Sequence, residues 1–423
     1  MNKTIHAPES LDNTTQEQGE IASQYQANSL WGKLSNIRNH PLWKPYLNIL
    51  GLFLVTRLAF ILITYVGLTL FNHYLHGPTT LKGTSFQFYV DSWIQWDAKS
   101  YIRIAHFGYS QVSSDVAFFP VYPAAIRVLE LVLGTYVGSG MLITNVTFLG
   151  SLFIIYHLAL DTTGNQQIAN RSLIYLSIFP TAFYTFTTYN ESTFIFFTAG
   201  MFLAINRRKW WLAGLLGAIA SATRTDGVLL ALPYLWEWWI KRDKSTALIT
   251  KASILRLLPI CIIPVGLILY CIYDWHVTGN PLEFAKVQAQ WGRHTTAPWV
   301  GIVNALDEIF VKQPFGSFYE IHDLLDLSMT IGFIVLTVLG WRSLPKSYSI
   351  WSISIFLLVL MAPSVVMDPL VSNQRFVLEL FPAFITLAIL SNKSPRLHQT
   401  IMIIFPCLLT VLTLVFISTY WMV

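Results

Sequence analysis

The sequence predicts an all-α polytopic membrane protein with about eleven transmembrane helices. Apolar residues make up 54% of the 423-residue chain and charged residues only 12%, whereas soluble domains carry roughly 25% charged residues. Apolar runs that are long enough to cross a bilayer recur along the chain, and short loops between them carry Lys and Arg. The net charge of +5 is spread over these loops, so it indicates membrane orientation and gives no support to nucleic-acid binding.

The chain divides into a polar tail and one membrane domain. Residues 1–44 are rich in Gln, Asn, Ser and Thr, so we expect a disordered cytoplasmic tail. Residues 45–423 are predicted to form a single transmembrane domain with long outer loops at 72–138 and 274–323. Basic residues at the ends of the apolar runs set the order of crossing. The predicted spans are 45–71, 141–160, 172–188, 193–205, a hairpin over 210–240, 254–273, 324–340, 350–366, 376–390 and 401–420.

An amphipathic stretch in the first outer loop, residues 93–109, predicts a helix that lies in the membrane interface. Its apolar stripe comprises Ile94, Ala98, Tyr101, Ile102 and Ala105. The opposite side carries Ser92, Gln95, Lys99, Arg103 and His106. Asp97 projects from the edge of the stripe, between Trp93 and Tyr101. A carboxylate at the rim of an apolar surface could contact a polar reactant at the boundary between lipid and water. The alternative interpretation of Asp97 is an ordinary hydrated side chain on an interfacial helix.

A second interfacial helix is predicted at residues 124–133. Pro120 and Pro123 prevent a regular helix just before it. A piece of about ten residues is too short for a hydrocarbon core that requires ~20 residues. The piece also carries Arg127 and Glu130, which favours a position at the membrane surface.

Six ionisable residues are predicted at membrane depth, where burying a charge is costly. They are Arg57, Glu191, Arg224, Asp226, Arg375 and Glu379. Such groups are candidates for a functional site. Arginine suits phosphate in particular, because its planar guanidinium group donates two parallel hydrogen bonds and stays charged.

Structural interpretations of these residues also exist. Arg375 and Glu379 are four residues apart, so an intrahelical ion pair would explain both. Glu191 lies at the start of a predicted span, where a carboxylate favours the helix dipole.

The remaining candidates have structural alternatives as well. Arg224 and Asp226 flank a predicted hairpin turn at 223–227, where they would pair locally or contact an anion. Arg57 lies near the centre of the first span, where an internal structural pair is as compatible with the sequence as a role in the site.

The sequence lacks the motifs of several common nucleotide-binding and metal-binding sites. The sequence contains no Gly-x-Gly-x-x-Gly, no Walker loop, no His-Glu-x-x-His and no Asp-x-Asp pair on an outer loop. His106, His276 and His294 lack the spacing of metal ligands, so we assign no metal and no cofactor. The three cysteines lie in apolar runs and form no disulfide framework or zinc motif.

A set of motifs in a fixed order resembles the PIG-V family of mannosyltransferases. The most specific block is Gln95-Trp-Asp-Ala-x-x-Tyr-Ile-x-Ile-Ala-x-x-Gly-Tyr109, followed by Ala117-Phe-Phe-Pro-x-Tyr-Pro123. Further matches are Tyr189-Asn-Glu-Ser192, Trp211-Leu-Ala-Gly-Leu-x-Gly217, Ala222-Thr-Arg-Thr-Asp-Gly227, Gln374-Arg-Phe376 and Phe381-Pro382. The resemblance covers residues 45–240 well and the remainder only at these last two points.

The resemblance implies a GT-C bundle, the class of polytopic, inverting enzymes that use lipid-linked sugars. It also implies a polyprenyl-phosphate or dolichyl-phosphate mannose donor and a catalytic Asp in the first outer loop, here Asp97. The family adds the second mannose of glycosylphosphatidylinositol anchors in eukaryotes and has many bacterial relatives. The chain departs from the family pattern at Thr225-Asp226, where Ser-Asn is usual, so the role of Asp226 stays open.

We therefore predict a mannosyltransferase that acts at the outer or lumenal face on a lipid or glycan acceptor. Asp97 is the expected general base. The expected substrate-binding residues are Arg224, Arg375, Glu191, Arg57, Asp226, Trp96 and Tyr101. We expect a bacterial plasma membrane rather than the endoplasmic reticulum. Alternatives are a transferase for another sugar or for a protein acceptor, a lipid-sugar flippase or transporter, and a non-catalytic assembly subunit.

Overall fold

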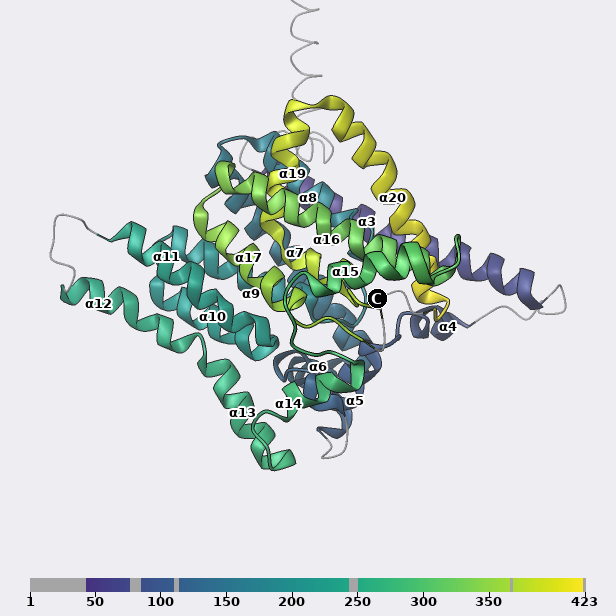
Figure 1. Ribbon diagram of the computed structural model, residues 1–423, viewed down its shortest axis with the longest axis horizontal. Coiled ribbons are helices and arrows are strands. Elements are labelled where there is room, and N and C mark those ends of the chain that lie inside the picture. The colour runs from purple at the N-terminus through teal and green to yellow at the C-terminus, as the bar shows by residue number, and fades with distance from the viewer. Residues whose placement is uncertain (1–42, 77–84, 110–113, 243–249, 366–367, 421–423) are drawn as a thin grey trace, which may run out of the picture. The chain divides into compact units, whose positions relative to one another are not determined.

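The computed structural model describes residues 43–76, 85–109, 114–242, 250–365 and 368–420 (Figure 1). Most of the predicted tail, residues 1–42, lies outside this part. The chain splits into two compact units, Met1–Leu52 and Phe53–Val423. The second unit holds every site discussed below. That residues 45–423 act as a single domain stays a prediction.

The described residues are helical apart from turns and loops, as predicted, and their one β-bridge joins Arg293 to Ser364. Five helical segments are long and apolar enough to cross a membrane: α3 (Lys44–His76), α7 (Tyr136–Thr163), the run Lys251–Thr278, α16 (Phe318–Ser343) and α20 (Pro395–Ile417). A sixth is the bent pair Asn373–Glu379 and α19 (Phe381–Lys393), which meet at 81°. Shorter apolar helices are α9 (Glu191–Asn206), α10 (Trp210–Thr223) and α17 (Lys346–Leu360). The chain is an integral membrane protein.

These long segments, counted over the described residues, number fewer than the eleven expected spans. Part of the difference comes from helices such as α9 and α17, which are unbroken but short, and part comes from breaks that interrupt apolar runs of the sequence. The predicted span 172–188 is divided into α8 (Gln166–Ser177) and the 3₁₀-helix η2 (Ala182–Thr185). The predicted hairpin over 210–240 is divided into α10, η3 (Thr225–Leu230) and α11 (Ala231–Lys241).

The remaining elements connect these helices. They are α4 (Phe86–Asp91), α5 (Asp97–Phe107), η1 (Ser114–Ala117), α6 (Val121–Leu133), α12 (Lys251–Leu257), η4 (Leu258–Ile262), α13 (Val265–Thr278), α14 (Glu283–Lys286), η5 (Val287–Trp291), α15 (Val300–Asp307), the π-helical turn η6 (Glu308–Lys312), α18 (Asn373–Phe376) and η7 (Val377–Glu379). The predicted outer loop 274–323 therefore contains several short helices.

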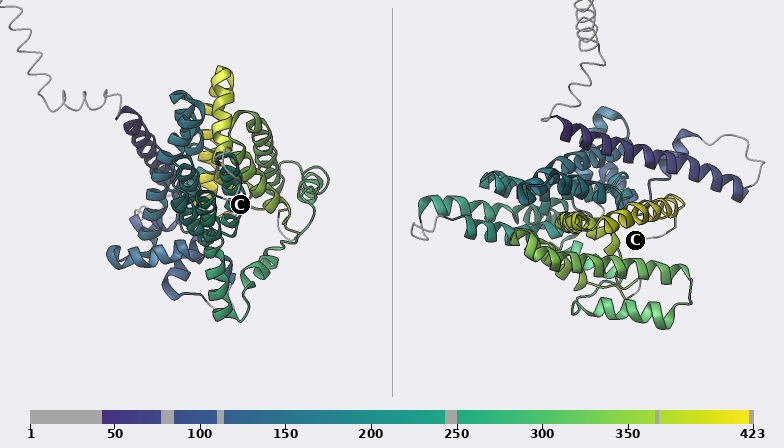
Figure 2. Two further views of the ribbon diagram at one scale, coloured as in Figure 1. Left: turned by 90° about the vertical axis from the view of Figure 1, so that its left-hand side faces the viewer. Right: turned by 90° about the horizontal axis from the view of Figure 1, so that it is seen from above.

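Helix packing within the second unit places the break after α10 in the interior. α9 packs against both α7 and α10, and α19 packs against α8, α16 and α20; Figure 2 shows these helices from two further directions. Gly266 of α13 and Gly227 of η3 permit two close approaches to α10. A Cβ on Gly266 would lie 2.1 Å from Ala218 O, and one on Gly227 would lie 2.4 Å from Ser221 N. Small residues at such crossings let helix backbones approach closely.

The amphipathic helix predicted in the first outer loop is present as α5, but it begins at Asp97 instead of upstream. Its buried face is Ala98, Tyr101, Ile104 and Ala105. Lys99, Arg103 and His106 are exposed as predicted, whereas Ser92 and Gln95 are buried because they precede the helix. The 3.6-residue periodicity thus held only from Asp97 onward.

The second short helix of that loop is also present, but it begins at Val121 instead of residue 124. Pro123 therefore lies in its first turn, where a helix tolerates proline. α6 has 13 residues, which at ~1.5 Å per residue gives about 20 Å, less than the ~30 Å hydrocarbon core. It buries Tyr122 and Ile126 and exposes Val128, Leu131 and Val132. One apolar face is therefore unpartnered, which agrees with the interfacial position predicted for it.

Candidate active site

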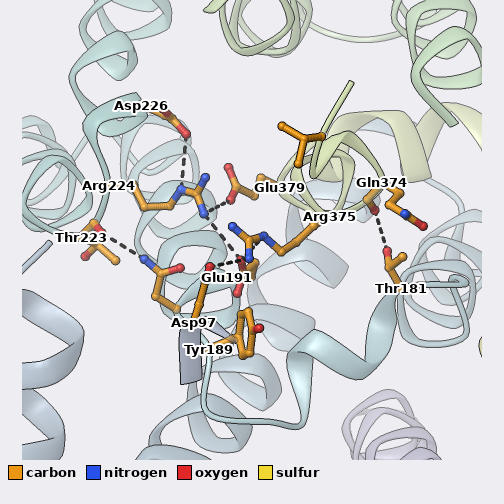
Figure 3. Close-up of polar contacts among 12 residues, drawn as sticks. Asp97, Thr181, Tyr189, Glu191, Thr223, Arg224, Asp226, Gln374, Arg375 and Glu379 are labelled. Carbon is orange, nitrogen blue, oxygen red and sulfur yellow. Dashed lines mark hydrogen bonds and ion pairs between the residues drawn. The ribbon is translucent and has the colours of Figure 1, made fainter. Parts of the chain in front are cut away.

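Charged side chains from four separate parts of the chain converge at one place (Figure 3). Asp97 is the first residue of α5, and Glu191 is the first residue of α9. Arg224 lies between α10 and η3. Arg375 belongs to α18, and Glu379 ends η7. Each residue therefore lies at a helix end or in a short helix, where the chain turns and a polar side chain can leave the apolar surface.

Two guanidinium groups connect the carboxylates. Arg375 Nη1 lies 2.6 Å from Asp97 Oδ2, and Arg375 Nε lies 3.1 Å from Glu191 Oε1. Arg224 Nη1 lies 3.0 Å from Glu379 Oε1 and 3.6 Å from the same Glu191 oxygen. Arg224 Nε lies 3.3 Å from Asp226 Oδ2. Glu191 thus joins the two arginines into one network.

This pairing excludes the intrahelical alternative for Arg375 and Glu379. The two residues lie four apart, but each contacts a different partner, and α18 gives way to η7 between them. The helix-cap alternative for Glu191 is only part of its role. Its position at the start of α9 does favour the helix dipole, but its carboxylate contacts both arginines.

The network is largely removed from solvent. Glu191 and Glu379 are each 1% exposed, and within the described residues their carboxylate oxygens accept no hydrogen bond beyond the ion pairs. The ring of Phe376 lies 4.9 Å from the Arg224 guanidinium carbon and 5.3 Å from that of Arg375. Buried charges depend on their partners, so removing one arginine would leave a carboxylate uncompensated.

The backbone before Asp97 is held in an uncommon conformation. Trp96 has φ = 50°, a region that costs a non-glycine residue of order 1–3 kcal/mol. Two hydrogen bonds hold the chain just before it: the Thr187 hydroxyl donates to Trp93 O at 2.5 Å, and the Tyr189 hydroxyl donates to Gln95 O at 3.2 Å. These contacts start α5 at Asp97 and direct its carboxylate toward Arg375.

A cavity of about 380 Å³ lies against this network. The predicted residues Asp97, Tyr101, Arg224, Asp226 and Arg375 line it. The opposite wall comes from the predicted second outer loop and includes Phe284, Gln288, Trp291, Arg293 and His294. The cavity combines carboxylate, guanidinium and aromatic surfaces, the groups that bind sugars and phosphates.

Arg293 is the functional candidate that the sequence did not reveal. Its guanidinium donates to Val371 O at 3.0 Å and to Ala362 O at 3.4 Å. It has no ion pair with any carboxylate in the described part of the chain. Burial, and then the positive charge of Arg375, lower the pKa of Arg293 to about 10, so it remains charged at neutral pH. No motif surrounds Arg293, and only its aromatic and basic neighbourhood in the loop gave any signal.

Three predicted binding residues lie outside the cavity lining. Glu191 lies behind it and contacts both arginines. Trp96 precedes Asp97 in the chain, and its backbone conformation sets where α5 begins. Arg57 donates instead to Thr185 O at 3.0 Å and to Thr185 Oγ1 at 3.1 Å. Its guanidinium carbon lies 4.6 Å from the Phe148 ring centre. This position gives no support to the substrate contact predicted for Arg57.

The described residues form a helical membrane protein with a cavity lined by buried arginines and carboxylates, and this places it in the class of membrane proteins whose intramembrane charges mark a functional site. A family model described as Mannosyltransferase (PIG-V) matches residues 44–277, more than half of the chain. The chain therefore belongs to the PIG-V mannosyltransferase family, as the motifs had predicted.

Individual relatives match over a shorter region. The chain is 29% identical over 147 residues to GPI alpha-1,6-mannosyltransferase 2 of Rattus norvegicus, and 29% identical over 146 residues to that of Mus musculus. Each match covers 32% of this chain and 29% of the relative. The matched part therefore spans less than a third of the length of these curated relatives.

Two solved structures are similar at a lower level. ArnT from Cupriavidus metallidurans, bound to undecaprenyl phosphate, gives a TM-score of 0.46 at 12% identity and covers 72% of this chain and 56% of that chain. The oligosaccharyltransferase AglB from Archaeoglobus fulgidus, in complex with an inhibitory peptide and a dolichol-phosphate, gives 0.43 at 12% identity and covers 87% of this chain and 56% of that chain. Scores below 0.5 do not establish a common fold.

Proposed function

We propose that this protein transfers a mannosyl residue, with inversion, from a polyprenyl-phosphate donor to an acceptor hydroxyl at the outer or lumenal face of the membrane. In this proposal it is a GT-C enzyme. Family membership supports the mannosyl donor. The single observation that carries the chemistry is the 2.6 Å contact between Asp97 and Arg375 at the wall of the cavity, because it places an ionisable acid beside a fixed cation.

Asp97 acts as the general base. The acceptor hydroxyl attacks the anomeric carbon of the sugar on the face opposite the lipid phosphate, and its proton passes to an Asp97 oxygen. The new bond joins the acceptor oxygen to the anomeric carbon, and the bond between that carbon and the phosphate oxygen breaks. Positioned proton transfer of this kind contributes typically 10²–10⁴-fold to the rate. One Asp97 oxygen is held by Arg375, the side chain is 22% exposed and the residue lines the cavity, so an acceptor can approach the carboxylate from there.

The arginines stabilise the leaving lipid phosphate. Negative charge develops on that phosphate as the sugar departs, and fixed cations nearby lower the barrier. Arg293 is the best placed for the first contact, since it has no competing carboxylate partner in the described part of the chain. Arg224 and Arg375 are already paired, so they would share their donors between carboxylates and phosphate. Asp226 and Glu191 then hold Arg224 in position, and Tyr101 provides apolar and hydroxyl surface to the sugar.

The first test is Asp97→Asn, assayed in proteoliposomes with polyprenyl-phosphate mannose that carries a radiolabelled sugar. We expect transfer to fall by about 10²–10⁴-fold, because the amide cannot accept the proton. Asp91→Asn is the matched control: Asp91 is exposed in α4 of the same loop, and its variant should transfer at the normal rate.

Two outcomes would contradict the proposal. Near-normal transfer by folded Asp97→Asn would remove Asp97 as the base. Transbilayer movement of the intact lipid-linked sugar, at equal rates in wild-type and Asp97→Asn protein and without any transfer, would identify a flippase instead.

A further inference from the structure

A second group of ionisable side chains lies at the start of α16, outside the lining of the cavity. His322 and Asp323 are adjacent on this helix, and Asp368 comes from the segment before α18. His322 is 1% exposed and Asp323 is 2% exposed, while the Asp368 side chain is 14% exposed. One potential ligand atom from each residue lies within 4.8 Å of the others. The three side chains therefore enclose one small polar volume.

Asp323 supplies the observation that points to a missing cation. Its Oδ1 atom is buried and has no hydrogen-bond partner in the described part of the chain. An ionised carboxylate without a partner is costly in a buried position. Two further carboxylates, those of Asp326 and Asp368, lie in the same group. Within the described residues His322 is the only basic side chain that forms an ion pair with them. Three carboxylates face one imidazole, and a bound cation would balance them.

We propose that His322, Asp323 and Asp368 bind one divalent transition-metal ion, Mn²⁺ or Zn²⁺. One imidazole nitrogen and two carboxylate oxygens form a mixed donor set that suits these borderline ions better than Ca²⁺ or Mg²⁺, which prefer oxygen alone. His322 Nδ1 lies 2.8 Å from Asp368 Oδ2. Two ligand atoms that each bind an ion at about 2.1 Å lie roughly 3 Å apart at a right angle and about 3.4 Å apart at the tetrahedral angle of zinc sites, so this pair needs only a small separation to share an ion.

Asp326 completes the site as an orienting group. His322 Nε2, the nitrogen that does not face Asp368, lies 3.7 Å from Asp326 Oδ2. A metal-bound histidine usually directs its second nitrogen toward a carboxylate, which fixes the ring. The other oxygen of Asp326 accepts the backbone N–H of Gln374 at 2.9 Å, and Gln374 is the residue before Arg375. The ion would therefore stabilise the short helix that carries Arg375 without touching the reacting groups.

Metal content tests this proposal without any assay of transfer. The full chain is purified in detergent, treated with EDTA, and titrated separately with MnCl₂ and ZnCl₂, with bound metal measured by mass spectrometry of the elements. We expect wild-type protein to take up one ion per chain. Asp323→Asn, which keeps the shape and removes the charge, should bind at least about tenfold more weakly. Asp274→Asn is the control, because Asp274 is an equally buried aspartate on α13 that lies outside this group.

Two results would overturn the site. One is stripped wild-type protein that takes up neither ion. The other is Asp323→Asn protein with wild-type stoichiometry and affinity. If Asp323→Asn does not fold, Asp368→Asn replaces it, since Asp368 is partly exposed and its substitution disturbs less packing. Loss of metal from Asp368→Asn supports the site, and unchanged binding removes it. Neither result depends on whether the protein transfers mannose.

Discussion

The two buried charge groups of this protein differ in how their carboxylates are balanced. At the start of α5, each carboxylate contacts an arginine: Asp97 and Glu191 contact Arg375, and Glu379 contacts Arg224. At the start of α16, carboxylates outnumber the one imidazole, and an oxygen of Asp323 is left without a partner. Each of these carboxylates in the first group has a cation within the chain, whereas Asp323 has no ion pair in the described residues and, in our proposal, takes its cation from outside. The same residue type therefore serves a permanent ion-pair network in one place and a ligand site in the other.

The largest expected effect comes from breaking the ion-pair network around Arg375. Arg375→Met should lower the free energy of unfolding by about 3 kcal/mol, because it leaves Asp97 and Glu191 with one cation fewer in a buried place. It should also reduce transfer by more than about 10²-fold, since Asp97 loses its fixed neighbour. Thermal unfolding in detergent and the radiolabel assay measure these changes.

Arg207→Met is the control for that variant. Arg207 pairs with Asp161, and the two side chains are 53% and 31% exposed, so the loss of this pair should cost little. Equal effects of the two substitutions would contradict the special role of the Arg375 network.

Arg224→Lys tests whether the network needs the guanidinium shape or only its charge. Arg224 uses Nε toward Asp226 and Nη1 toward Glu379 and Glu191. A lysine ammonium is a single point charge, so it cannot reproduce the planar arrangement in which the guanidinium group contacts these carboxylates. We expect transfer to fall by about tenfold or more while the protein stays folded. A normal rate at saturating donor would show that Arg224 supports only the break between α10 and η3.

Chelation should affect the group around His322 and leave the ion-pair network around Arg375 unchanged. Because an ion that binds only the folded state stabilises it, EDTA should lower the melting temperature of metal-loaded wild-type protein by about 5 °C. Added Zn²⁺ or Mn²⁺ should restore it. Arg375→Met protein should show the same shift, since its metal ligands are intact. A melting temperature that does not respond to EDTA in metal-loaded protein would contradict a stabilising ion.

Arg57→Met should have the smallest effect. Arg57 is buried against Phe148 and Thr185, and its Nε and Nη1 atoms have no hydrogen-bond partner in the described residues. Methionine retains the apolar contact and removes the unsatisfied groups, so we expect stability to be unchanged or higher. Transfer should stay within about threefold. A large loss of donor affinity would restore the substrate-binding role that the sequence predicted for Arg57.

Local patterns in the sequence predicted much of the site. The amphipathic stretch identified α5 and Asp97, because a helical stripe is visible in consecutive residues. Arg224, Asp226 and Glu191 were found because charge is rare in apolar surroundings. The same approach missed the break between α8 and η2 inside the predicted span 172–188, since composition does not show such a break. The structure places Arg57 outside the cavity lining, because hydropathy predicts how deep a residue lies in the membrane but not which way its side chain points.

The sequence alone determined the membrane class and the family and singled out Asp97 as a candidate base, because each depends on composition or on residues close together in the chain. Tertiary structure decided the partners. Asp97 and Arg375 are 278 residues apart, and no periodicity predicts their contact. Arg293 enters the cavity, and Asp368 joins His322, only because loops and helices from distant parts of the chain pack together. Hydrophobic burial determines which surfaces meet, and the charges at those surfaces acquire their neighbours only then.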